Sequence, residues 1–132
     1  GAGLERFRRV IELQGGNPRV CDDPTLLPQA PETVVVRSER DGRVARLAAR
    51  AVGHAGMLLG AGRETLDGPI DPSVGFVFHK KVGDPVAVGE PIVTVHVGAS
   101  SRREAALARL AEAIVVAPEA PLRGPLVLDI LA

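Results

Sequence analysis

The sequence predicts an α+β fold: a small mixed β barrel-sandwich that is interrupted by a helix and a loop and has flanking helices. Segments with apolar residues at helical spacing alternate with short runs rich in Val and Ile. Gly-Asp and Gly-Glu pairs separate the β runs of the second half, as in many small barrels and sandwiches. Only three of the 132 residues are aromatic, all of them Phe, so the core must be built from Val, Leu, Ile and Ala.

The first predicted element is a helix over residues 4–14. Its apolar residues recur at the spacing of one helical face: Leu4, Phe7, Val10 and Ile11. Gly15, Gly16 and Pro18 end this helix. A helix this short is only marginally stable alone in water, so its apolar face must pack against another surface. Residues 17–32 contain four prolines and predict an irregular linker.

Two short β runs follow the linker. Residues 33–37 predict a strand because three of the five are Val. A second run, residues 44–47, comes after a turn centred on Asp41 and Gly42, and Asp-Gly in this place favours a hairpin between the two runs. Residues 47–59 then have the apolar spacing of a helix.

Glycines mark the inside and the end of this helix. Gly53 and Gly56 each cost up to about 1 kcal/mol relative to Ala, which we attribute to close backbone packing. We interpret Gly60 as the residue that ends the helix. Gly60-x-Gly62 is not a dinucleotide or phosphate loop, because it follows a helix, lacks a third Gly at position 65 and is closed by no Lys-Ser or Lys-Thr pair.

Residues 60–73 are the longest stretch without periodicity, and loops on a rigid scaffold often carry function. Arg63, Asp67 and Asp71 form a polar cluster in this loop. They are candidates for ligand contact, although spacing alone establishes no acid/base pair. The candidate residues of a substrate-cleft loop are therefore Gly60, Gly62, Arg63, Asp67 and Asp71. The three histidines have no metal-ligand spacing, so we expect no metal site: His54, His79 and His96.

The third region is the most regularly patterned. Residues 74–80 predict a strand, and residues 82–97 predict short strands with turns at Gly83-Asp84 and Gly89-Glu90. Residues 101–104, Ser-Arg-Arg-Glu, spell a capping box. The helix predicted after it ends before Pro118 and buries Leu107, Leu110, Ala111 and Ile114. A final apolar run, residues 126–131, predicts a closing strand.

The composition excludes several classes of function. Sixteen basic residues balance 16 acidic ones and aromatic residues are scarce, so the chain lacks the basic field and stacking platforms of nucleic-acid binding. Its single cysteine, Cys21, excludes an internal disulfide and a thiolate metal cage. The apolar runs are far shorter than the roughly 20 residues that cross a membrane. We expect a cytoplasmic protein with no nucleic-acid or membrane partner.

The turns of the third region resemble those of biotinyl and lipoyl carrier domains. The unit over residues 82–92, together with residues 41–44, has the paired Gly-Asp turns of those flattened barrels. Carriers hold an attachment lysine just after this unit, but residues 95–100 contain no Lys, and Lys80 and Lys81 precede it. We therefore predict the barrel architecture without the carrier function.

The chain as a whole resembles the C-terminal portion of pyrimidine-nucleoside phosphorylases, the thymidine phosphorylase family. Leu59-Gly60-Ala61-Gly62-Arg63 and Lys81-Val82-Gly83-Asp84 are the more specific blocks. The remaining matches occur in the same order over most of the chain: Gly1-x-x-Leu4-x-x-Phe7, Gln14-Gly15-Gly16, Asp22-Asp23-Pro24, Leu27-Pro28, Gly53 through Leu59, Ile70-Asp71-x-x-Val74-Gly75, His79-Lys80 and Gly89-Glu90-Pro91-Ile92.

The resemblance implies an enzyme that cleaves thymidine or uridine with phosphate, giving a free base and a pentose 1-phosphate. In the family, a Lys-x-Ser-x-Gly-Gly loop of a large α/β domain holds the phosphate, and an Arg, Ser and Lys set holds the base. This chain has no Lys before Lys80 and no Ser before Ser38. We therefore expect the catalytic residues upstream, none in this chain, and no cofactor beyond phosphate as co-substrate. The opening Gly1, without Met, fits a piece of a longer enzyme that is inactive alone.

The resemblance also implies a division of the chain. Residues 1–16 are then the terminal helix of the catalytic domain, 17–32 a linker, and 33–132 the C-terminal phosphorylase domain. The loop that matches Gly60–Asp71 lies near the cleft that closes over substrate. Our hypothesis is that this loop helps to exclude water during closure, with Arg63 and Asp71 fixing its shape. The implied partners are the catalytic domain, a pyrimidine nucleoside, phosphate and a second subunit. The alternative is a noncatalytic barrel-like module for protein interaction. A Lys-x-Ser-x-Gly-Gly segment in the upstream reading frame would decide for the phosphorylase.

Overall fold

The computed structural model describes residues 1–63, 65–119 and 121. They form three α-helices, two short 3-10 helices and two three-stranded sheets. This confirms the predicted α+β class. Among the described residues the strands form two antiparallel sheets and close no barrel, so the mixed and barrel-like parts of the predicted barrel-sandwich are wrong for these residues. The reason is that helices, not further strands, cover the inner face of the first sheet. The closing strand predicted over 126–131 lies outside the described residues.

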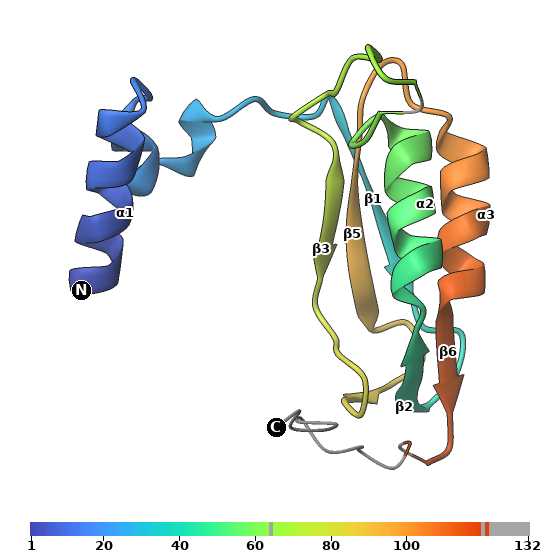
Figure 1. Cartoon of the computed structure of the whole chain (residues 1–132). Coiled ribbons are helices and arrows are strands. Elements are labelled where there is room, and N and C mark those ends of the chain that lie inside the picture. The colour runs from blue at the N-terminus through green and yellow to red at the C-terminus, as the bar shows by residue number, and fades with distance from the viewer. Residues whose placement is uncertain (64, 120, 122–132) are drawn as a thin grey trace, which may run out of the picture.

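The N-terminal segment, residues 1–31, lies to one side of the sheets (Figure 1). It contains α1 (Ala2–Leu13) and the 3-10 helices η1 (Pro18–Cys21) and η2 (Pro24–Leu26). Arg8 of α1 donates two hydrogen bonds, of 2.7 and 2.8 Å, to the carboxylate of Asp22. The side chains of Asn17 and Asp23 cap η1 and η2 by accepting backbone N–H groups. The region predicted to be an irregular linker is therefore ordered from α1 onward by short polar contacts.

The first sheet has the strand order β1-β5-β3. Its strands are β1 (Glu32–Arg37), β5 (Pro91–Val97) and β3 (Gly75–Phe78). β5 is the central strand, and its side chains alternate between the two faces. Val93, Val95 and Val97 are buried on one face, whereas Thr94 and His96 are half-buried on the other. The core of the molecule therefore lies on the valine face of β5.

The second sheet has the order β4-β2-β6. Its strands are β4 (Pro85–Val86), β2 (Gly42–Leu47) and β6 (Ile114–Ala117). The predicted hairpin between the runs at 33–37 and 44–47 is wrong, because β1 pairs with β5 while β2 pairs with β4 and β6. The turn at Asp41 and Gly42 instead connects the two sheets. A Cβ at Gly42 would lie 2.4 Å from the carbonyl oxygen of Ala117, so this close approach to β6 requires glycine.

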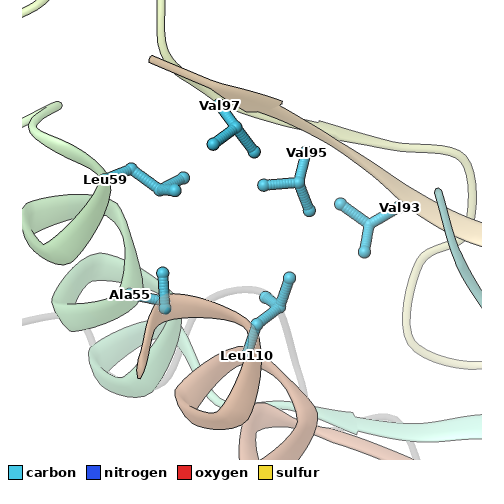
Figure 2. Packing of buried hydrophobic residues seen from close by; sticks show 7 residues of the cluster. Ala55, Leu59, Val93, Val95, Val97 and Leu110 are labelled. Atoms are coloured by element: carbon cyan, nitrogen blue, oxygen red, sulfur yellow. The ribbon is translucent and has the colours of Figure 1, made fainter. Parts of the chain in front are cut away.

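The helices α2 (Ala49–Leu59) and α3 (Arg103–Ala113) pack side by side over the first sheet (Figure 1). Figure 2 shows Ala55 and Leu59 of α2 and Leu110 of α3 directed toward the three buried valines of β5. A smaller cluster joins Val44 and Val86 of the second sheet to Ile92 of β5. Ile114 packs against both clusters, so the two sheets share one continuous apolar interior.

Two details of the helices differ from prediction. The helix predicted to continue through Ile114 ends at Ala113, and residues 114–117 pair with β2 as β6. Two adjacent valines after Ile114 favour a strand there. Ala111 is exposed, and the buried residues of α3 are Ala106, Leu110 and Ala113.

The two glycines inside α2 differ from each other. Gly56 is buried, and a Cβ there would lie 3.6 Å from the Phe76 ring, in ordinary van der Waals contact. Gly53 is exposed, and a Cβ there would meet nothing within 4 Å. Gly56 therefore packs against β3 without requiring glycine, and close packing is the wrong explanation for Gly53.

Candidate functional site

The candidate loop, residues 60–73, begins where α2 ends. Gly60 has φ 104°, a left-handed conformation that favours glycine, and its N–H donates to carbonyl oxygens of the last helical turn. This confirms the prediction that Gly60 ends the helix. The backbone N–H of Asp71 donates to the Gly60 carbonyl oxygen at 2.9 Å. The two ends of the loop are therefore joined.

Asp71 organises the C-terminal end of the loop. Its Oδ1 accepts hydrogen bonds from the Ser73 hydroxyl at 2.6 Å and from the Ser73 backbone N–H at 2.9 Å. These two donors lower the pKa of the Asp71 carboxyl below its ordinary value, against a smaller opposing effect of desolvation. The ionised carboxylate is consequently the form that holds this turn together.

The other candidate residues are placed differently. Arg63 and Asp67 are exposed and make no hydrogen bond or ion pair with any residue that the structure describes. Gly62 lies against α2, where a Cβ would be 3.0 Å from Cγ of Met57. The fold thus brings Gly60 and Asp71 together, and it leaves Arg63 and Asp67 directed to no protein partner in the described residues.

A turn formed by residues 98–101 lies beside both ends of the loop. The Ser101 hydroxyl accepts the Gly98 backbone N–H at 2.9 Å and donates to the Leu59 carbonyl oxygen at 2.7 Å. The predicted capping box is therefore wrong: α3 begins at Arg103 without a side-chain cap, because Ser101 is bonded to the end of α2. Local sequence carries no signal for this contact, since its two residues are far apart in the chain.

Polar side chains elsewhere are engaged in structural contacts. Nε2 of His79 lies 2.8 Å from the Thr94 hydroxyl. The Lys80 ammonium forms an ion pair with Glu90 and, with the Ala87 N–H, lowers the pKa of the Glu90 carboxyl. No group of three or more potential metal ligands occurs among the described residues. None of their helices has both the length and the apolar character to cross a membrane.

The larger surface depression, of about 280 Å³, contains none of the candidate residues. It is lined by residues of β1, α3 and β6 and by the segment that follows β1: Val36, Arg37, Ser38, Glu39, Arg40, Ile92, Ala111, Ile114, Val115 and Val116. The Ser38 hydroxyl is already bonded to the Arg40 carbonyl oxygen. The depression therefore adds no nucleophile or acid/base pair to the candidate loop.

Comparisons with known proteins agree with the motifs. Residues 43–117, more than half of the chain, match the family described as Pyrimidine nucleoside phosphorylase C-terminal domain. The pyrimidine-nucleoside phosphorylase of Geobacillus stearothermophilus is 46% identical over 96 residues, which are 73% of this chain and 22% of that protein. The pyrimidine-nucleoside phosphorylase of Bacillus subtilis is 41% identical over 120 residues, 91% of this chain and 28% of that protein.

The chain spans about a quarter of the length of these curated relatives. The match includes β2 from its second residue onward, α2, the candidate loop, β3, β4, β5, α3 and β6. It confirms the resemblance carried by the Leu-Gly-Ala-Gly-Arg and Lys-Val-Gly-Asp blocks. The chain belongs to the family of pyrimidine nucleoside phosphorylase C-terminal domains.

Proposed function

We propose that this chain is the C-terminal part of a pyrimidine-nucleoside phosphorylase, a cytoplasmic pentosyltransferase that converts thymidine or uridine and phosphate into a free base and a pentose 1-phosphate. The observation that carries the proposal is the family match over residues 43–117. The catalytic groups belong to residues encoded upstream of Gly1, and phosphate is the co-substrate. The described residues then serve as a support and partial cover for that site.

The exposed face of α1 supports this arrangement. Its large apolar side chains are 44–69% exposed: Leu4, Phe7, Val10 and Leu13. These residues follow each other at intervals of three along the helix, and exposed apolar side chains are stabilised when they are buried against another surface. We assign residues 1–16 to the catalytic domain, whose upstream residues bury these side chains, residues 17–32 to the linker, and residues 33–132 to the C-terminal domain.

The exposed part of the 60–73 loop partly covers the active site in this proposal. Its ends are joined through Gly60 and Asp71, while Arg63 and Asp67 remain accessible. A guanidinium is suited to an anionic or carbonyl-bearing ligand, because it donates several hydrogen bonds in a fixed plane. Arg63 therefore contacts bound substrate or the facing wall of the cleft when the enzyme closes and excludes water.

The test is to produce the chain together with the residues encoded upstream of Gly1 and to measure phosphate-dependent release of thymine and uracil. The longer protein should turn over at least one nucleoside, and the 132-residue chain alone should turn over neither. Arg63→Ala in the longer protein should raise KM or lower kcat, whereas Arg50→Ala, an exposed arginine on α2, should change neither. Turnover by the short chain, or an upstream frame without a Lys-x-Ser-x-Gly-Gly segment, contradicts the proposal.

A further inference from the structure

The turn at residues 98–101 holds the candidate loop by a contact that only glycine permits. Gly98 is buried, and a Cβ at this position would lie 2.5 Å from Oδ2 of Asp71 and 2.8 Å from Cγ1 of Val74. Real Cβ atoms essentially never approach heavy atoms to within 3.0 Å. The Asp71 carboxylate is therefore seated directly against the backbone of Gly98.

The Asp71 carboxylate has little freedom to move from this seat. Its other oxygen, Oδ1, is held by two donors of Ser73, and its backbone N–H is bonded to Gly60. Displacing Oδ2 therefore breaks the Ser73 hydrogen bonds or shifts the backbone of the loop. A change at Gly98 is transmitted to both ends of the 60–73 loop.

Ser101 fixes the same turn to the start of the loop. Its hydroxyl joins the Gly98 N–H to the Leu59 carbonyl oxygen, one residue before Gly60. The Arg102 backbone N–H adds a hydrogen bond of 2.9 Å to the Leu58 carbonyl oxygen. The turn thus contacts the chain immediately before the loop through Ser101 and the end of the loop through Gly98.

We propose that Gly98 and Ser101 are positioning residues for the 60–73 loop, which set the location of Arg63 relative to bound nucleoside without touching it. This inference rests on the proposed function, because the loop acts on substrate only in the complete enzyme. It adds two residues that lie outside the loop: Gly98, which the sequence pattern does not mark, and Ser101, which the pattern marks only as a helix cap. It also attaches the loop at both of its ends, through Leu59 and Asp71.

The attachment of the loop to Gly98 and Ser101, here called the anchor, is tested on the 132-residue chain. This test needs no assumption about activity. Amide hydrogen exchange is measured at Asp71 and Ser73, whose N–H groups are bonded within the loop. Gly98→Ala should accelerate exchange there by about tenfold or more, and Gly53→Ala, the same change at an open position, should not. Ser101→Ala should accelerate exchange at the same positions, because the hydroxyl that joins the turn to α2 is lost. Ser101→Thr retains a hydroxyl and should show the protection of the wild type. Ser100→Ala is the matched control and should leave exchange unchanged.

The link to catalysis is tested in the longer protein. Gly98→Ala and Ser101→Ala should raise KM for the nucleoside by about fivefold or more, and Ser101→Thr should restore it. A purely structural defect reduces the amount of active enzyme and so lowers kcat with KM unchanged. Should Gly98→Ala fail to fold, the three Ser101 and Ser100 variants provide the same comparison.

The experiments separate three claims: the attachment of the loop, its positioning role and the proposed function. Unchanged exchange at Asp71 and Ser73 overturns the anchor, and accelerated exchange with an unchanged KM in an active enzyme overturns the positioning role. An inactive wild-type longer protein overturns the proposed function, and the positioning role with it. In a double-mutant cycle, Asp71→Ala should remove most of the effect of Gly98→Ala on exchange of the residue 71 N–H, which is bonded to the Gly60 carbonyl oxygen and is retained in the alanine variant. Full additivity would contradict direct contact.

Discussion

The N-terminal segment and the α/β module, residues 32–117, bury apolar side chains to very different extents. Residues 1–31 include no buried residue, and Phe7 and Leu13 are 58% and 69% exposed. In the module, Val44, Val93 and Leu110 are fully buried. Both parts have regular helices, so secondary structure does not distinguish them. The module carries its own core, whereas α1 leaves its large apolar side chains exposed among the described residues.

The largest expected effect comes from removing a core side chain of the module. Leu110→Ala should lower the free energy of unfolding by about 2–5 kcal/mol, because it loses buried apolar contact and leaves a cavity between α3 and β5. Leu13→Ala, the same change in α1, should alter it by less than about 0.5 kcal/mol. Urea denaturation followed by circular dichroism measures both. If both variants lost the same free energy of unfolding, α1 would contribute to the core as much as the module does, and the contrast between the two regions would be wrong.

A smaller effect should follow from Gly42→Ala, which tests whether the second sheet belongs to the same cooperative unit. The new Cβ meets the Ala117 carbonyl, so we expect a loss of about 1–3 kcal/mol in the free energy of unfolding. Gly75→Ala is the matched control, because Gly75 has nearly the same φ, 153° against 151°, but nothing within 4 Å of its Cβ position. Loss of β6 amide protection without a shift of the global midpoint would show that the second sheet unfolds separately.

The smallest effect concerns pH and compares two carboxylates, one in each region. Lys80 holds the pKa of Glu90 below its ordinary value of 4.5, and Arg8 holds the pKa of Asp22 below 3.8. A carboxyl with a depressed folded pKa contributes stability that is complete above its unfolded pKa and is lost as the pH falls through the folded pKa. Of these two carboxyls only Glu90 lies in the module, so its protonation, like that of Asp71, should weaken the module, whereas protonation of Asp22 should not.

Urea midpoints measured from pH 7 down to about pH 3 test this expectation. Glu90→Gln should flatten the decline of the module midpoint below pH 4.5, and Asp22→Asn should leave that decline as in the wild type. A flattened decline in Asp22→Asn would mean that the N-terminal segment stabilises the module after all.

Helices, strands and the helix stop at Gly60 were predictable because each depends on neighbouring residues. The face of α1, the valines of β1 and the glycine with positive φ all have local signals. The short sequence blocks around Gly60 and Gly83 were likewise sufficient to identify the family. Local pattern was therefore sufficient for the class of fold and for the place of the candidate loop.

Strand partners and the anchor of the loop were not predictable in this way. Asp41-Gly42 is typical of a hairpin, yet the burial of Val34 and Val36 against β5 decides the pairing of β1. Ser101 has the local pattern of a cap, but a carbonyl of α2 is its partner in space. Gly98 has no local signal, because its requirement comes from the Asp71 carboxylate. These outcomes depend on long-range contacts, which override local preference.

The order β1-β5-β3 has a consequence for synthesis on the ribosome. Val34 pairs with Val95, and in the other sheet Val44 pairs with Val116. At roughly 5–20 residues per second, β1 emerges about 3–12 seconds before its partner. During that interval a valine-rich edge is open to pairing with other nascent chains. The module therefore needs its last described strand, β6, before it can complete either the shared core or the second sheet.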